Sequence, residues 1–317
     1  MKKLTMTLIC VLALFFASPV WACDDDDCNH GQPDGGNIDV YTSAYGQDED
    51  LTEDYGSDYG SAAGFSGQGG GAGHLTGSFS GEGELEGHLS ATGASVGHME
   101  TYDLDMEDGN GAGAYNENWS QGLLSGSIDG EGTGEYGLEA SGLSESATCA
   151  GSYYGGDAEN APTYGLAEQT AQGYFTGQGG EEFDGTLSEE FSAGVESFGS
   201  SYSESYGQEY EDEGNHISAL GSNVGTLSEV QVTADNLPDG METGWQIDGQ
   251  AGTVTEQSQN HKAKALGQYN AQGTGDTTAQ GNAEGYSYTS TVTPESGMGQ
   301  INNSQAGMSV GVTTNPE

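Results

Sequence analysis

One stretch of this chain alternates between two kinds of side chain with a period of two. From His74 to Glu100, the odd positions carry apolar or very small residues such as Leu75 and Phe79, with glycine at many others. The even positions carry mostly Ser, Thr, Glu and His. A period of two places successive side chains on opposite faces of a β-strand. The pattern therefore predicts β structure with one packed face and one solvated face.

This alternating stretch is too long to be one ordinary strand. Fully extended, it would span about 90 Å, whereas strands in globular proteins are usually about 3–10 residues long. We therefore expect the chain to turn while it keeps the same residues on the packed face. A two-residue hairpin loop would exchange the two faces, so odd-length connections are expected, with glycine supplying positive φ angles.

Alternation returns between Gly122 and Gly142, at an offset of 49 residues from the first stretch. A short glycine-containing core recurs four times, at 65–69, 79–83, 128–132 and 175–179. Together these indicate an eroded internal repeat of about 48 residues. The 56 glycines also disfavour helices. The expected fold is all-β, with glycine-rich alternating strands that form either a layered β-sandwich or an irregular β-solenoid.

The composition shifts along the chain and predicts four regions. Residues 1–22 form a signal peptide and residues 23–63 a disordered acidic arm, because that arm has few aliphatic side chains to bury. Residues 64–210 form the glycine-rich β-repeat region. Residues 211–317 are richer in Gln, Asn and Thr, and form a β region that either continues the same sheet or is a second domain.

The N-terminus has the features of an export signal. Lys2 and Lys3 precede an apolar run from Leu8 to Phe16, and Ala22 ends a plausible cleavage site. The run is too short for a permanent transmembrane helix, and we expect no transmembrane span elsewhere. The chain is predicted to be exported, with an extracellular or cell-surface location favoured over the periplasm.

Three cysteines follow the signal peptide, an odd number for an oxidising compartment. The tetrapeptide 20–23 resembles a bacterial lipobox, although Trp21 is bulkier than usual there. The resemblance implies lipidation of Cys23, which would anchor the protein to a membrane and leave Cys28 and Cys149 to form a disulfide. The alternative is a bridge between Cys23 and Cys28 with Cys149 unpaired.

The charge is strongly one-sided. After removal of the signal peptide, Lys262 and Lys264 face 50 acidic residues, and the chain contains no arginine. Such a chain is repelled by nucleic acids and anionic lipid. Divalent cations or cationic surfaces are the expected partners, and nucleic acid is excluded.

Two groups of carboxylates are candidates for cation binding. Asp103, Asp105, Glu107 and Asp108 resemble the start of a calcium loop, which makes calcium a candidate ligand. The match is poor, because Gly109 comes one place late and Ala114 occupies the twelfth position, so solvated turn carboxylates are the alternative. Glu82, Glu84 and Glu86 share one strand face and predict either cation binding or a solubilising surface.

No catalytic motif is present, and we do not expect an enzyme. The composition is similar to that of bacterial surface and amyloid-matrix proteins, but the C-terminal region lacks the regular Gln and Asn ladder of curli-type repeats. We predict an exported structural or adhesive surface or matrix protein that acts through an acidic β-sheet surface and can self-associate through sheet edges. The alternative is a calcium- or other cation-binding module that orders on ion binding.

Overall fold

The computed structural model describes residues 35–53, 61–106, 109–154, 163–212, 215–236, 242–257, 261–274, 277–293 and 299–314. The chain divides into two compact units, Met1–Pro33 and Asp34–Glu317, and every described residue belongs to the second. The predicted signal peptide and the cysteines Cys23 and Cys28 lie outside the described residues.

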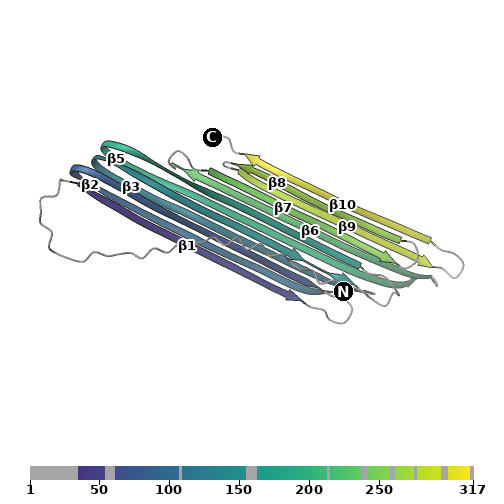
Figure 1. Cartoon of the computed structure of the whole chain (residues 1–317). Coiled ribbons are helices and arrows are strands. Elements are labelled where there is room, and N and C mark those ends of the chain that lie inside the picture. The colour runs from purple at the N-terminus through teal and green to yellow at the C-terminus, as the bar shows by residue number, and fades with distance from the viewer. Residues whose placement is uncertain are drawn as a thin grey trace. The chain divides into compact units, whose positions relative to one another are not determined.

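The described residues form strands and no helix, which confirms the all-β prediction for this part of the chain. The strands are β1 Gly35–Glu53, β2 Ala62–Met106, β3 Gly109–Ala150, β4 Tyr153–Tyr154, β5 Thr163–Asp212, β6 Asn215–Asp235, β7 Glu242–Gln257, β8 His261–Thr274, β9 Thr277–Thr293 and β10 Gly299–Thr314. Within this part of the chain they form one antiparallel sheet in the order β1-β2-β3-β5-β6-β9-β10, to which β4 and β7 are joined through β5, and β8 through β7 (Figure 1).

The three longest strands, β2, β3 and β5, each contain a bend at which the strand curves back on itself (Figure 1). In β2 the pairing register shifts between Ser80 and Glu84. The neighbouring strands place Gly132 and Gly185 opposite each other at this level, with φ angles of 121° and 112°. These angles are accessible to glycine and costly for other residues.

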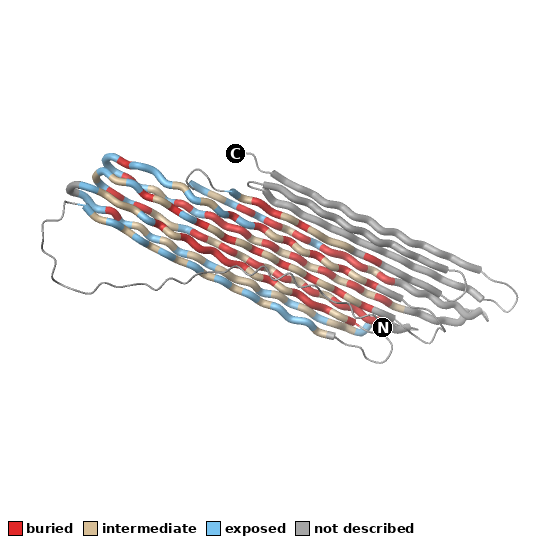
Figure 2. Tube along the Cα trace, viewed as in Figure 1, coloured by how far each residue is buried: buried red, intermediate tan, exposed pale blue. Residues whose placement is uncertain are grey.

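The same residue parity stays buried on both sides of each bend. In β3, even-numbered residues such as Leu124 and Leu138 are buried before and after Gly132, and in β5 odd-numbered residues such as Phe175 and Val195 are buried before and after Gly185. Figure 2 shows this alternation of buried and more exposed residues along neighbouring strands. The expectation that the chain turns without exchanging its faces is confirmed.

Backbone segments before and after the bends come very close to each other at several glycines. A Cβ atom placed on Gly69 would lie 2.5 Å from the carbonyl oxygen of Ala94 and 2.1 Å from that of Gln121. A Cβ atom on Gly122 would lie 2.2 Å from the carbonyl oxygen of Gly70. Real Cβ atoms do not approach backbone oxygens so closely, so glycine is required where these backbones meet.

The buried interior has an apolar part and a polar part. The apolar cluster includes Leu75, Ile128 and Phe175, and Ile38 and Val40 of β1 pack against it. The polar part consists of buried serine and asparagine side chains, with hydrogen bonds between several of them. Its members include Asn116, Asn118, Ser120, Ser144, Ser197 and Ser201.

One expectation about organisation needs correction. Residues 35–53 were expected to belong to the disordered arm, but they form β1, because Ile38 and Val40 find apolar partners and the strand pairs along the glycine-rich part of β2. For residues 211–317 two alternatives were open, a continuation of the same sheet and a second domain. The described strands of this region continue the sheet, beginning with β6, which pairs with β5.

Candidate functional site

The candidate calcium ligands do not form a cluster in the described residues. Asp103 is exposed near the end of β2, and the backbone of Asp105 pairs with that of Asn110. Glu107 and Asp108 lie outside the described residues. No group of three or more His, Cys, Asp or Glu side chains in the described part of the chain is arranged to hold a metal ion.

Cys149 lies on β3, between Gly64 of β2 and Glu168 of β5 in the pairing register. Its Sγ atom donates to the carbonyl oxygen of Ala150 at 3.0 Å. Burial, with a smaller contribution from the charge of Glu168, raises the pKa of the Cys149 thiol to about 11. Because Cys28 lies outside the described residues, the Cys28–Cys149 disulfide stays a prediction.

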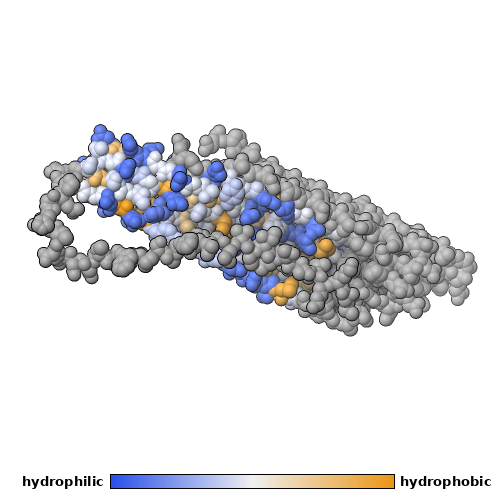
Figure 3. Space-filling view, viewed as in Figure 1, coloured by the Kyte–Doolittle hydropathy of each residue, from blue (hydrophilic) through white to orange (hydrophobic). Residues whose placement is uncertain are grey.

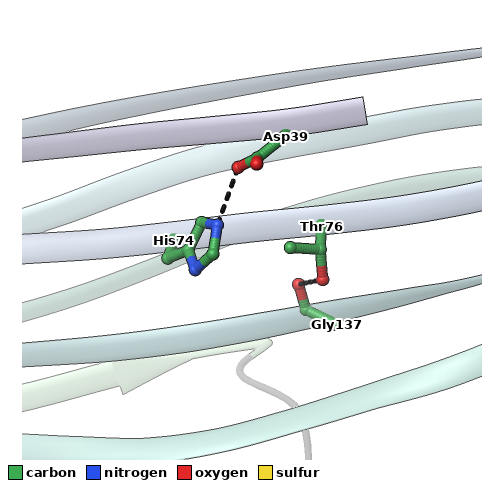
Figure 4. A network of polar contacts seen from close by, with 4 residues as sticks. All are labelled: Asp39, His74, Thr76 and Gly137. Carbon is green, nitrogen blue, oxygen red and sulfur yellow. Dashed lines mark hydrogen bonds and ion pairs between the residues drawn. The ribbon is translucent and has the colours of Figure 1, made fainter. Parts of the chain in front are cut away.

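Strand β1 is joined to β2 by a side-chain hydrogen bond on the sheet surface. The Nε2 atom of His74 lies 2.7 Å from the Oδ1 atom of Asp39 on the neighbouring strand (Figure 4). The ring of Tyr41 meets the His74 ring edge-on, with centroids 6.4 Å apart. Close by, Thr76 Oγ1 donates to the carbonyl oxygen of Gly137 at 3.4 Å (Figure 4). The two contacts of His74 tie the acidic edge strand β1 to β2, and the Thr76 hydrogen bond joins β2 to β3.

Carboxylates face each other directly across neighbouring strands near the bends. Of the predicted glutamate row, Glu84 and Glu86 are exposed. The register places three pairs of carboxylate residues directly opposite one another: Glu84 and Glu131, Glu86 and Asp129, and Glu135 and Glu182. Directly opposite residues have Cβ atoms about 4.5–5.5 Å apart, and like charges at that separation repel.

A row of five glutamines and one glutamate, the amide row, crosses six strands in the pairing register. The register aligns Gln47, Gln68, Glu145, Gln172, Gln246 and Gln272 on successive strands. Gln68 Nε2 donates to Glu145 Oε2 at 2.8 Å, and Tyr45 Oη donates to Gln68 Oε1 at 2.8 Å. No periodic Gln appears in the sequence, because the row is assembled from residues far apart in the chain.

A patch of aromatic, acidic and amide side chains lies across β3, β5 and β6. Its first row is Trp119, Phe198 and Glu229, and its second row is Gln121, Glu196 and Gln231. We call these six residues the Trp119 patch. Gln121 Nε2 donates to Glu196 Oε1 at 2.8 Å. An open hollow of about 210 Å³ lies here, and Trp119, Phe198, Glu196, Glu229 and Gln231 line it.

Exposed apolar side chains border the Trp119 patch. Val96 on β2 is directly opposite Trp119 and is 57% exposed. Leu227 on β6, two residues before Glu229, is 42% exposed. Trp119 and Phe198 themselves are intermediate in exposure. The apolar surface therefore continues across four neighbouring strands.

Tyrosine rings next to this patch lie over glycines of the neighbouring strand. A Cβ atom on Gly113 would come within 2.2 Å of the Tyr102 ring, and one on Gly225 within 2.3 Å of the Tyr202 ring. Because a glycine has no side chain, the ring occupies that space and covers the backbone of the neighbouring strand. These tyrosines thus extend the aromatic surface beyond the Trp119 patch.

Two tyrosine hydroxyls on this surface donate to glutamates. Tyr102 Oη donates to Glu204 and Tyr115 Oη to Glu117, each at 2.7 Å. Burial, and then the hydrogen bond to Glu117, raises the pKa of Tyr115 to about 12. Burial and the bond to Glu204 raise the pKa of Tyr102 further. The hydroxyls therefore stay protonated and hold the glutamates in place.

Sequence reasoning missed the Trp119 patch because its residues come from three strands. The sequence held one indication, the odd or even numbering of these residues. Trp119 is odd-numbered in β3, where the even-numbered residues are buried. Phe198 is even-numbered in β5, where the odd-numbered residues are buried. Large aromatic residues on the solvated face of a sheet indicate an exposed apolar surface. The visible surface of the described part is largely hydrophilic, with scattered hydrophobic residues (Figure 3).

Comparison of the chain with protein-family models, with curated proteins and with solved structures gave no match. Among the described residues no helix is long and apolar enough to cross a membrane. Function is therefore inferred from the sheet and from the side chains that it displays.

Proposed function

We propose that this chain is an exported structural or adhesive protein of a bacterial surface or matrix, which acts through the outer faces of a two-layered, glycine-rich β-sheet. The strand halves that lie face to face across Gly69 and Gly122 support two layers. The antiparallel pairing of neighbouring strands favours this sandwich over a solenoid. Both layers then present a broad outer surface.

The observation that carries the proposal is the length over which the strands pair. β3 pairs with β2 and with β5 along almost all of its 42 residues. The side chains of the exposed parity include the paired carboxylates, the amide row and the Trp119 patch. A large, regular surface with repeated acidic and aromatic groups suits adhesion better than chemistry on one small molecule.

Adsorption of the purified mature chain to defined surfaces tests this proposal. Because 50 acidic residues face four lysines in the whole sequence, we expect retention on amine-terminated surfaces and little retention on carboxylate-terminated ones at low salt. A quartz-crystal microbalance measures both. Equal retention on the two surfaces would contradict an acidic adhesive face.

Self-association through a sheet edge is part of the proposed structural role. Among the described strands, β1 pairs only with β2 and so presents a 19-residue edge without proline or lysine, residues that commonly protect an edge from further pairing. Its acidic residues oppose such pairing at low salt. Sedimentation velocity at increasing salt concentration tests the idea, with larger assemblies expected as the charges are screened; a monomer at all salt concentrations would refute it.

The opposed carboxylate pairs favour a second candidate, a cation-binding module. Glu84 and Glu131, and likewise Glu135 and Glu182, would each gain from a cation between them. Circular dichroism with calcium and with chelator separates the two functions. A sheet spectrum that does not depend on chelator supports the structural role, and a coil that becomes sheet only with calcium supports the module.

Export and anchoring are proposed from the N-terminal sequence. The signal-peptide features of residues 1–22 and the lipobox-like tetrapeptide that ends at Cys23 support them. Mass spectrometry of the mature N-terminus measures both at once. A chain that begins at a lipid-modified Cys23 indicates an anchor, one that begins at unmodified Cys23 indicates simple cleavage, and one that retains Met1 rules out export by this route.

A further inference from the structure

We propose that the Trp119 patch is a docking site for an amino-sugar polymer, whose protonated amino group enters the hollow between Trp119, Phe198, Glu196 and Glu229. This inference rests on the proposed adhesive function and names the chemistry of its partner. It assigns a binding role to residues that come from three strands and that no sequence motif connects.

The lining of the hollow matches a protonated amine. Its walls include the aromatic rings of Trp119 and Phe198, which are directly opposite each other on β3 and β5. Its remaining walls include the carboxylates of Glu196 and Glu229. A cation over an aromatic face gains free energy from the ring quadrupole, most strongly with tryptophan, and a carboxylate adds a charge-assisted hydrogen bond.

Charge selects the kind of glycan. β2, β3, β5 and β6, which form this surface, contain no lysine or arginine. Glu196 accepts a hydrogen bond from the neutral amide of Gln121, which leaves its negative charge uncompensated by that contact. A polymer that carries carboxylates or sulfates would be repelled, whereas one that carries ammonium groups is attracted.

The surroundings of the hollow suit a polymer of sugars. Sugar rings have an apolar C–H face that packs on aromatic rings, and a rim of hydroxyl groups that bonds to amides and carboxylates. Val96 extends the apolar surface onto β2. Tyr115 and Tyr202 lie directly opposite each other on β3 and β5 and form a second aromatic row. The pair of Glu117 and Ser200 lies between this row and the row of Trp119. Gln121 and Gln231 supply amides in the row beside the rings. The two aromatic rows lie four residues apart, about 13 Å, so sugar units a short way along one polymer can contact both rows.

Tryptophan fluorescence of the full mature chain provides a direct test. Trp245 is 3% exposed, so the emission change on adding a ligand reports mainly on Trp119. The probes are a glucosamine hexamer, an N-acetylglucosamine hexamer and hexalysine, at mildly acidic pH, where the amino groups of the probes are charged. We expect the glucosamine hexamer to bind and the neutral acetylated hexamer to bind at least about tenfold more weakly.

Variants separate the hollow from the total charge of the chain. The double variant Glu196→Gln with Glu229→Gln, and the variant Trp119→Ala measured by calorimetry, are each expected to weaken binding of the glucosamine hexamer at least about tenfold. The matched control, Glu135→Gln with Glu182→Gln, removes the same charge elsewhere on the sheet and is expected to bind like the unmodified chain. Circular dichroism verifies that each variant retains its sheet.

Three results would overturn the inference: equal binding of the acetylated hexamer, equal loss of binding in the control double variant, or hexalysine binding that matches glucosamine binding and is unchanged by Trp119→Ala. Any of them can occur while the chain still adsorbs to amine-terminated surfaces. In that case the adhesive function stands and the amino-sugar site fails. Loss of adsorption as well would contradict both.

Discussion

At the scale of single residues, glycine is used where two backbones or a backbone and a ring meet. Gly122 lies against the carbonyl oxygens of Gly70 and Leu143, and Gly142 lies under the ring of Phe175 on the neighbouring strand. A strand interior normally loses about 0.5–1 kcal/mol when alanine is replaced by glycine. Here the missing side chain allows contacts that an alanine would prevent, so these glycines stabilise the fold.

The substitution Gly122→Ala tests that argument. The added Cβ atom would lie 2.2 Å and 2.5 Å from two carbonyl oxygens, so the strands must separate locally, and we expect the free energy of unfolding to fall by about 1–3 kcal/mol. Urea unfolding followed by circular dichroism measures the change. Gly137→Ala is the control, because its nearest neighbour would be Thr76 Oγ1 at 3.3 Å, and it should change the free energy by less than about 0.5 kcal/mol. Equal losses in both variants would refute the close-packing argument.

The buried thiol and the tyrosine hydroxyls predict a loss of stability at alkaline pH. The pKa of Cys149 is raised from 9.0 to about 11 and that of Tyr115 from 10.0 to about 12, while the pKa values of Tyr102 and Tyr136 are raised further. A pKa that is higher in the folded than in the unfolded chain gives stability that is complete below the unfolded pKa and is lost as pH rises through the folded one.

The contribution of these groups to the free energy of unfolding should therefore be constant up to about pH 9. It should fall between about pH 9 and pH 12. Denaturant titrations at several pH values measure it. Cys149→Ala removes the earliest part of the decline, which begins near pH 9, and Tyr115→Phe removes part of the later decline. A stability that is the same at neutral pH and at pH 11 would show that neither group is protected from ionisation by the fold.

At the scale of elements, the sequence predicts the strands and predicts that each turn keeps the same residues on the packed face. It does not predict which strands pair. The alternation around Leu75 and Leu89 indicates which side chains are packed, and its length requires a turn that keeps the phase. The bends near Gly132 and Gly185 satisfy this requirement. Register is different, because a shift of two residues leaves the alternation unchanged and so cannot be read from a periodic pattern.

The amide row and the Trp119 patch depend on that register. Gln68 meets Glu145, and Trp119 meets Phe198, only because β2, β3 and β5 pair as they do. Contacts between chemically different interior groups, such as Ser201 with Asn116 at 2.7 Å and Ser144 with Ser197 at 2.6 Å, distinguish one register from another. These side chains are spread over separate strands, so no local window of the sequence contains both partners.

The bend of β5 offers a test of backbone strain without steric contact. Gly185 has a φ angle of 112°, and a Cβ atom added to it would have no neighbour within 4 Å. Gly185→Ala should therefore destabilise the chain by about 1–3 kcal/mol through conformation alone. Chemical denaturation of this variant, with Gly137→Ala as the control at an ordinary φ angle, measures the cost. No loss of stability would mean that the bend tolerates other conformations.

At the scale of the whole molecule, the dominant electrostatic term is repulsion. Fifty acidic residues face four lysines, of which Lys262 and Lys264 lie on β8 and the other two in the predicted signal peptide. The sheet brings carboxylates together, as in the pair Glu84 and Glu131. Folding thus raises the density of like charge, and the interior must outweigh that cost. The same repulsion limits uncontrolled pairing of edge strands, which keeps an extended sheet surface from aggregating.

Relief of this repulsion should stabilise the folded chain. We expect the free energy of unfolding to rise as sodium chloride is raised from about 0.01 M to about 1 M, because the Debye length falls from about 30 Å to about 3 Å.

Glu131→Gln, which removes the charge opposite Glu84, should raise the free energy of unfolding by about 0.2–1 kcal/mol at low salt and by less at high salt. Glu145→Gln is the matched control, because Glu145 faces Gln68 and Gln172 and accepts a hydrogen bond from Gln68, so that variant should not be stabilised. If both substitutions stabilise the chain equally, the repulsion comes from the net charge alone. If only Glu131→Gln stabilises it, the repulsion comes from carboxylates that the register places directly opposite each other.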